Sequence, residues 1–256
     1  MVGSLAPFRP AETVDEVLDR LDAVISAARR ERSRLGYFAS LYRNVTARGR
    51  EAILRGDFED GGRMAALDVA FANRYLDALH RFSAAEPTSK CWEEAFGATR
   101  RWRPIVLQHL LLGINAHINL DLGAAAAGVS SGGALAGLRR DFDTVNGILC
   151  AMLDDVQDRL TRIWPLMGPL DRVGCRTDEA VLHFSILHAR DAAWDVATTL
   201  VHLDPEHADR ELARVDEWAT VLARLIRTPG MSGSAAALMI RVTELRGVPK
   251  VLDALS

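Results

Sequence analysis

Helical periodicity runs through almost the whole chain and constrains its fold more than any other feature. Apolar residues recur at steps of three and four residues in one segment after another, and no segment alternates in the manner of a half-buried strand. Glycines, prolines and short polar stretches separate the segments. The pattern predicts an all-α protein, a bundle of about eight or nine helices forming one domain over residues 1–256.

Composition narrows the class of protein. The 256 residues are 49% hydrophobic and 25% charged, which is typical of a globular chain that can bury a sizeable core. A net charge of −3 provides no strong field to attract nucleic acid. Three widely spaced cysteines suggest no disulfide framework and favour a cytoplasmic location. We expect neither a signal peptide nor a membrane span, and the oligomeric state stays open.

The most apolar segment, about 104–127, carries an unusual number of polar residues. It is apolar nearly all round, so it is expected to be the central buried helix of the bundle. At about 100° per residue, His109, His117 and Asp121 form one slanting stripe, while Asn115 and Asn119 lie on another side. Buried polar groups need partners, so this helix is predicted to line an internal polar site.

His117 and Asp121 are the sharpest pair in this stripe. At four residues apart they are neighbours on one helix face. The carboxylate could orient the imidazole as a general base, or both could bind one divalent metal ion (Zn, Fe or Mg) with ligands from facing helices. The pair could also serve packing alone, holding the bundle together through hydrogen bonds.

Other polar residues, two on the central helix and the rest on amphipathic helices, could face the same interior. Carboxylates of this kind are candidate metal ligands, amides and an indole can contact a substrate, and an arginine can hold an anionic group. Those outside the central helix could equally belong to a solvated helix face. The candidates for metal binding are Asp77, Asp141 and Asp191, those for substrate binding are Asn73, Asn115, Asn119 and Trp194, and Arg190 is the candidate for the anion.

Four blocks of the sequence resemble a known family. They are EDGGRMAALDVAFANRYLDAL, RRWRPIVLQHLLLGINAHINLDLGAAAA, LRRDFDTVN and ARDAAW, and the likeness extends over almost the whole chain. The family is catalogued as domain-of-unknown-function family 5995. The resemblance implies a single α-helical domain and carries no catalytic residues with it.

A weaker likeness concerns the central helix alone. The order His-x3-Gly-x3-His-x3-Asp, from His109 to Asp121, is similar to helices of zinc-dependent phospholipase C and the related nucleases. That resemblance implies a zinc site built from His and Asp in an all-α protein. The chain departs from the pattern because it lacks the N-terminal tryptophan ligand and the full set of histidines of those enzymes.

These observations favour a small-molecule enzyme with its site inside the bundle. His117, Asp121, His109 and Arg190 are the expected catalytic residues, and His117 and Asp121 are also the first candidates for metal binding. The apolar surroundings suggest a partly hydrophobic or amphipathic substrate, for instance one of secondary metabolism, and hydrolysis, elimination or cyclisation as the reaction. The alternatives are a carrier for an apolar ligand and a protein whose polar core residues only specify helix packing.

Overall fold

Every regular element in the described part of the chain is a helix, as the periodicity predicts. The structure is a computed structural model that describes residues 8–130, 135–164, 176–229, 231–245 and 247–255, without the side chains of 150, 153–157, 176–185 and 231–236. Within these ranges the elements are α1 (Val14–Glu31), α2 (Gly36–Arg55), α3 (Gly61–Ser83), α4 (Lys90–Ala98), α5 (Val106–Ala116), the π-helix η1 (His117–Leu122), α6 (Gly123–Val129), α7 (Leu135–Ile163), α9 (Arg176–Leu200), α10 (Pro205–Arg227), α11 (Met231–Thr243) and α12 (Val248–Leu255).

The described residues form eleven α-helices, more than the eight or nine expected. Two breaks account for the difference. The predicted central helix is divided into α5 and α6 by the π-helical segment η1. The last predicted helix is divided into α11 and α12, with Gly247 between them at a φ of 99°, a left-handed conformation that glycine adopts without strain.

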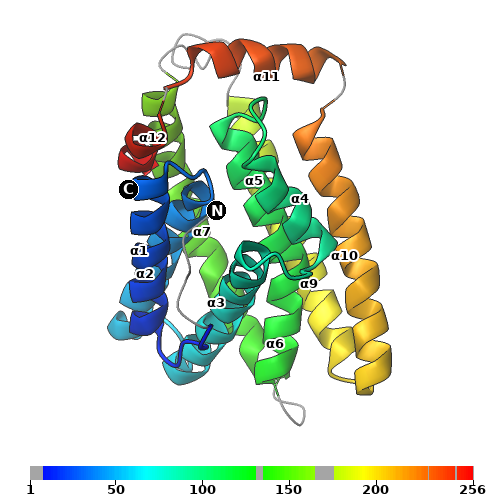
Figure 1. Cartoon of the computed structure of the whole chain (residues 1–256). Helices are drawn as coiled ribbons and strands as arrows, with labels where there is room; N and C mark the ends of the chain where they lie inside the picture. The colour runs from blue at the N-terminus through cyan, green and yellow to red at the C-terminus, as the bar shows by residue number, and fades with distance from the viewer. Residues whose placement is uncertain (1–7, 131–134, 165–175, 230, 246, 256) are drawn as a thin grey trace.

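The α5–η1–α6 segment is the central helix of the bundle (Figure 1). Helix α5 packs against α2, α4 and α10, and η1 packs against α3, α9 and α10. The segment Val106–Val129 is long and apolar enough to cross a membrane by length and composition, but 72% of its most apolar window is buried within the protein. Its hydropathy is therefore that of a core helix surrounded by other helices.

Two glycines allow neighbouring helices to approach this central segment closely. A Cβ on Gly113 would lie 2.4 Å from the ring of Phe38 on α2. A Cβ on Gly123 would lie 2.6 Å from the carbonyl oxygen of Ala193 on α9. Because any side chain would force these helices apart, the two glycines fix how tightly α2 and α9 enclose the central helix.

Several helix starts follow the sequence signals directly. The Thr13 hydroxyl accepts a hydrogen bond from the Glu16 N–H at the start of α1 (3.1 Å). The Glu16 carboxylate accepts a hydrogen bond from the Glu12 N–H (2.9 Å). At the start of α10 the Asp204 carboxylate accepts from the His207 N–H (3.0 Å), and Pro205 occupies the first turn.

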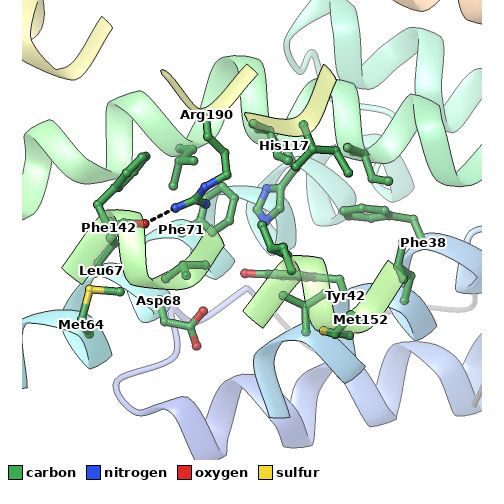
Figure 2. Close-up of a pocket in the computed structure, with 18 residues that line it drawn as sticks. Phe38, Tyr42, Met64, Leu67, Asp68, Phe71, His117, Phe142, Met152 and Arg190 are labelled. Atoms are coloured by element: carbon green, nitrogen blue, oxygen red, sulfur yellow. Dashed lines mark hydrogen bonds between the residues drawn. The ribbon is translucent and has the colours of Figure 1, made fainter. Parts of the chain in front are cut away.

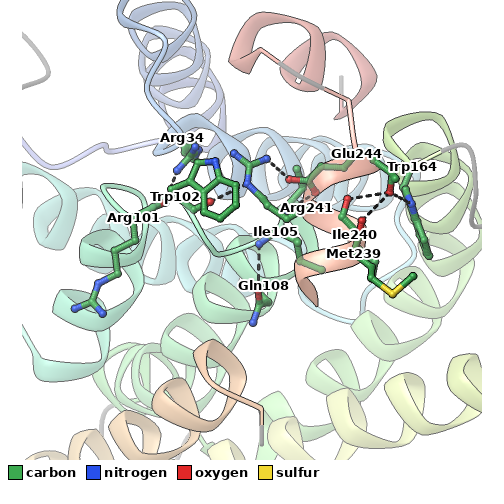
Figure 3. A network of polar contacts seen from close by, with 12 residues as sticks. Arg34, Arg101, Trp102, Ile105, Gln108, Trp164, Met239, Ile240, Arg241 and Glu244 are labelled. Atoms are coloured by element: carbon green, nitrogen blue, oxygen red, sulfur yellow. Dashed lines mark hydrogen bonds and ion pairs between the residues drawn. The ribbon is translucent and has the colours of Figure 1, made fainter. Parts of the chain in front are cut away.

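A buried polar network holds the start of α5 beneath α11 (Figure 3). Glu244, which follows α11, accepts a hydrogen bond from the Val106 N–H (3.1 Å) and pairs with Arg241. Arg241 also donates to the Trp102 carbonyl (2.7 Å). The Glu244 contact satisfies one of the N–H groups that the first turn of a helix leaves free, and the network ties the start of the central helix to the end of α11.

Candidate active site

A mostly apolar cavity lies between the central helix and α2, α3, α7 and α9. Its volume is about 170 Å³, close to that of an engineered cavity of about 150 Å³ that holds one benzene molecule. Figure 2 shows 18 lining residues. Fourteen are apolar, and the four that carry chemistry come from four different elements: Tyr42 (α2), Asp68 (α3), His117 (η1) and Arg190 (α9).

The His117 side chain is fixed on one edge and free on the other. Its Nδ1 lies 3.2 Å from Asp121 Oδ2, while Nε2 is buried without a hydrogen-bond partner. Because the carboxylate accepts, Nδ1 carries the proton and Nε2 keeps its lone pair. Burial lowers the pKa of His117 despite the opposing effect of Asp121. The ring is therefore neutral at physiological pH, with an available base at the cavity wall.

Asp121 is itself held by two further donors. The indole N–H of Trp92 donates to Oδ2 (3.0 Å) and the Arg74 Nε donates to Oδ1 (3.1 Å). Together with His117 Nδ1, these donors satisfy the hydrogen-bonding capacity of a carboxylate that is buried. The arrangement fixes the orientation and tautomer of His117, which is what a general base requires of its partner.

Aromatic rings hold the plane of the His117 imidazole. Phe71 stacks on it with centroids 3.5 Å apart and an interplanar angle of 8°. The Tyr42 ring meets it edge-on at 4.5 Å. His117 begins the π-helical segment, an irregularity that is frequent at functional sites and that a constant 100° per residue does not anticipate. The expected contact between His117 and Asp121 nevertheless forms.

Asp68 and Tyr42 add two polar groups to the cavity wall. Asp68 Oδ2 is buried and has no hydrogen-bond partner among the described residues, and the buried Tyr42 hydroxyl has the Thr46 hydroxyl as its polar neighbour. Burial raises the pKa of Asp68 to about 7. Burial, followed by the charge of Asp68, raises the pKa of Tyr42 well above its usual value. Both groups can therefore keep a proton near neutral pH and donate it in a hydrogen bond to a ligand.

Arg190 lines the same cavity and is almost fully buried. Its Nε donates to Asn146 Oδ1 (2.5 Å) and its Nη2 donates to the Phe142 carbonyl (2.6 Å). The guanidinium carbon lies 4.3 Å from the centroid of the Phe142 ring. Burial lowers the pKa of Arg190 to about 10, which leaves it charged. The structure thus places a cation at the cavity wall, as expected for a residue that contacts an anionic group.

His109 lies outside the cavity lining, although the sequence grouped it with His117. It is buried beside the Tyr37 ring, with centroids 5.8 Å apart, and neither ring nitrogen has a hydrogen-bond partner among the described residues. Burial, with Arg34 and Arg241 nearby, lowers its pKa to about 3. The structure does not bring His109 together with the other predicted catalytic residues.

The predicted substrate-binding residues make their contacts within the protein and lie outside this cavity, although Asn73 lines the outer pocket described below. Asn115 donates to the Ala219 carbonyl on α10 (2.8 Å) and Asn119 donates to Asn115 (3.0 Å). Asn73 exchanges two hydrogen bonds with the backbone of Ala11 (2.7 and 2.9 Å). Trp194 packs against Phe142, with ring centroids 5.1 Å apart. None of the four lines the cavity.

Three of the predicted metal ligands are likewise occupied elsewhere. Asp141 accepts from the N–H groups of Glu59 and Asp60 (2.7 and 3.0 Å). Asp191 forms an exposed ion pair with Arg139 (3.1 Å). Asp77 pairs with Arg81 (3.1 Å) and borders a separate outer pocket that Asp121 also reaches.

The residues that the structure describes offer no group of three His, Cys, Asp or Glu side chains that could hold a metal ion. Of the predicted set, His117 and Asp121 are in contact and Asp77 borders a pocket that Asp121 also reaches, whereas Asp141 and Asp191 have their own partners elsewhere. Within the cavity, His117 and Asp68 are the two side chains of these types. The described donors at the cavity are thus too few to hold a divalent ion by themselves.

Sequence reasoning missed Asp68 and Tyr42 as site residues. Asp68 does not share a helix face with Asn73 and Asp77, the polar residues that follow it in α3. It lies instead on the same face of α3 as Met64 and Phe71, four residues before it and three after it. A carboxylate in the middle of an apolar stripe is a signal of a buried functional acid, and it was present in the sequence.

Comparison with known proteins gives one match. A family model described as a family of unknown function, DUF5995, matches residues 14–229. No curated protein and no solved structure matches the chain. The weaker likeness to zinc-dependent phospholipase C and the related nucleases is therefore not supported by these comparisons.

Proposed function

The chain belongs to the DUF5995 family, whose model covers most of its length. From the geometry of the cavity we propose that the protein is an enzyme that moves a proton within a small, mostly apolar molecule. One observation carries this proposal. The buried Nε2 of His117 has no partner at the wall of a cavity, while Nδ1 is anchored by Asp121. A protein that used His117 for packing alone would leave this lone pair unsatisfied at a cost of about 1–3 kcal/mol.

Three of the four polar residues of the cavity, His117, Tyr42 and Asp68, suit proton abstraction next to a carbonyl group. His117 Nε2 takes a proton from a carbon of the substrate, and the electron pair of that C–H bond moves onto the adjacent carbonyl oxygen. Tyr42 and protonated Asp68 donate hydrogen bonds to this oxygen as its negative charge develops. His117 then returns the proton to the same carbon or to another one, so no further reactant is needed.

This division of roles follows from the opposite effects of burial on the two kinds of group. Burial lowers the pKa of His117 and raises that of Asp68 to about 7. The imidazole is thereby kept neutral as a base and the carboxyl group is kept protonated as a donor. Pairs of groups whose environments shift their pKa values in this way are typical of acid–base active sites.

The expected hydrolysis is less well matched than an isomerisation, elimination or cyclisation. Among the described lining residues there is no serine or cysteine that could act as a nucleophile beside His117. The reaction class that we propose is therefore proton transfer at carbon. The divalent ion expected from the sequence stays a prediction, and no step described here uses it.

Deuterium exchange tests the proposal without knowledge of the natural substrate. Small cyclic ketones such as cyclohexanone fit a cavity of benzene size, and their α-protons exchange in D2O when a base abstracts them. We expect the protein to accelerate this exchange, as seen by loss of the α-proton signal in NMR spectra. His117→Gln should reduce the acceleration by about 10²-fold or more, since general bases contribute about 10²–10⁴-fold.

The matched control is His80→Gln, which removes an imidazole from α3 outside the cavity lining. It should leave the exchange rate unchanged. The proposal fails if the wild-type protein accelerates exchange of no ketone in a panel of this size, or if His117→Gln is as active as the wild type while folded by circular dichroism.

The second candidate is a carrier for an apolar ligand, and the apolar majority of the lining residues favours it. A carrier would bind cyclohexanone or phenol without accelerating exchange. Its affinity for these probes would change little in His117→Gln, because apolar contacts supply most of the binding free energy.

A further inference from the structure

Arg190 is a buried cation that has no acidic partner in direct contact among the residues whose side chains the structure describes. Its exposed fraction is 5%. Its two described hydrogen bonds go to neutral groups, the amide of Asn146 and the Phe142 carbonyl. The charges of Asp143 and Asp191 act on it from further away. Both of these carboxylates form their ion pairs with Arg139, on the outer side of α7.

An uncompensated buried charge is costly, and proteins usually pair it. The partner of Arg190 is not found among the described residues, where no ion pair involves it. The side chain nevertheless lines the cavity that holds His117 (Figure 2). A ligand in that cavity would bring its own anionic group within reach of the guanidinium, whose planar donors match a carboxylate.

The chemistry of the cavity selects the kind of anion. A single arginine neutralises one negative charge, and the remaining walls are mostly apolar. A phosphate group carries more charge and needs more donors than these walls provide. The cavity volume of about 170 Å³ suits a molecule of roughly the size of a substituted benzene ring.

We propose that the substrate is a small apolar carboxylate, with its carboxylate at Arg190, its hydrocarbon body against the apolar walls and its reacting carbon at His117. This inference rests on the proposed proton transfer for the role of His117, whereas the binding of the anion depends on Arg190 alone. It names the substrate class of the site and makes Arg190 the residue that selects it.

The experiment compares two probes that differ mainly in charge, benzoate and benzyl alcohol. Binding to the wild-type protein is measured by isothermal titration calorimetry. We expect benzoate to bind about tenfold or more tightly than benzyl alcohol, and each probe to compete with the other. In Arg190→Met this preference should disappear through weaker binding of benzoate, while the affinity for benzyl alcohol changes little.

Arg139→Gln is the matched control, because Arg139 is a neighbouring arginine that lies outside the cavity and pairs with Asp143 and Asp191. It should leave benzoate binding unchanged. If Arg139→Gln weakens benzoate binding as much as Arg190→Met does, the anion binds at the surface and the inference is wrong. Retained binding of benzyl alcohol shows that the Arg190→Met cavity is intact.

If Arg190→Met does not fold, benzoate and benzyl alcohol binding to the wild-type protein and to Arg190→Lys tests the inference instead. Equal or weaker binding of benzoate to the wild type, or benzoate that does not compete with benzyl alcohol, contradicts the inference. Arg190→Lys should keep part of the preference, since it retains the charge and loses the planar donor pair.

The two proposals fail in different ways. Tight binding of benzoate through Arg190 without any proton exchange would contradict the proposed enzyme activity and would still support the anion site. Exchange of neutral ketones that depends on His117, with no preference for benzoate over benzyl alcohol, would contradict the proposed substrate class and would still support the enzyme activity.

Discussion

Trp92 donates its indole N–H to Asp121 Oδ2 across 3.0 Å, and this oxygen also accepts from His117 Nδ1. The contact joins α4 to the central helix and satisfies a buried carboxylate. It also means that the orientation of the proposed base depends on a residue that does not line the cavity. Trp92 is therefore a positioning residue for His117 through Asp121.

Trp92→Phe removes this donor and keeps most of the aromatic packing. We expect a loss of about 2 kcal/mol in the free energy of unfolding, because hydrogen bonds to charged groups contribute about 1.5–3 kcal/mol. Urea denaturation measures the loss. Trp164→Phe is the comparison, since its indole donates to the neutral hydroxyl of Thr243 at an exposed site. A loss of unfolding free energy no larger than that of Trp164→Phe would contradict the stabilising role of the hydrogen bond from Trp92 to Asp121.

Gly113→Ala tests the close crossing of α2 and α5. The added Cβ would lie 2.4 Å from the Phe38 ring, so the helices must separate. Overpacking of this kind typically costs about 1–3 kcal/mol. Gly49→Ala is the matched control in α2, because a Cβ there meets nothing within 4 Å. It should be neutral or stabilising by up to about 1 kcal/mol, and both changes can be followed by thermal denaturation.

The spacing of residues along the central helix predicted the features of the site that depend on local helix geometry. Residues four apart on a helix are neighbours, so the contact between His117 and Asp121 could be expected from their positions in the chain alone. The buried position of that helix followed from its apolar character on all sides. The π-helical segment could not be expected, because it depends on how η1 packs against α3, α9 and α10 and leaves no signal in the spacing.

The residues that complete the site depended on tertiary contacts. Asp141 and Asp191 both resembled ligands, but the fold brings backbone N–H groups to the first and Arg139 to the second. Arg190 and His117 are 73 positions apart, and only the packing of α9 against η1 brings them to one cavity. Asp68 differs from these residues, because its place within an apolar stripe of α3 could be seen in the sequence without any tertiary contact.

Asp141→Asn and Asp191→Asn should differ sharply in their effects on stability. Asp141 is 1% exposed and accepts from two backbone N–H groups and Arg63. An amide cannot accept at both positions, so we expect a loss of about 2–3 kcal/mol. The exposed pair of Asp191 contributes at most about 1 kcal/mol. Equal losses in chemical denaturation would mean that Asp141 does not hold the start of α3.

Asp68→Asn should stabilise the protein, and by more at higher pH. The folded state raises the pKa of Asp68 from 3.8 to about 7, so between these values it binds a proton that the unfolded chain has lost. The stability of the wild type therefore falls as pH rises through this window, by up to about 4 kcal/mol at about 1.36 kcal/mol per pKa unit. Asparagine has no proton to lose, and the two buried histidines titrate alike in both proteins. The free energy of unfolding of Asp68→Asn should thus exceed that of the wild type by an amount that grows from pH 4 to pH 7 and then levels off. Urea denaturation at several pH values measures it, and a difference that stays constant over this range would show that the cavity does not raise the pKa of Asp68.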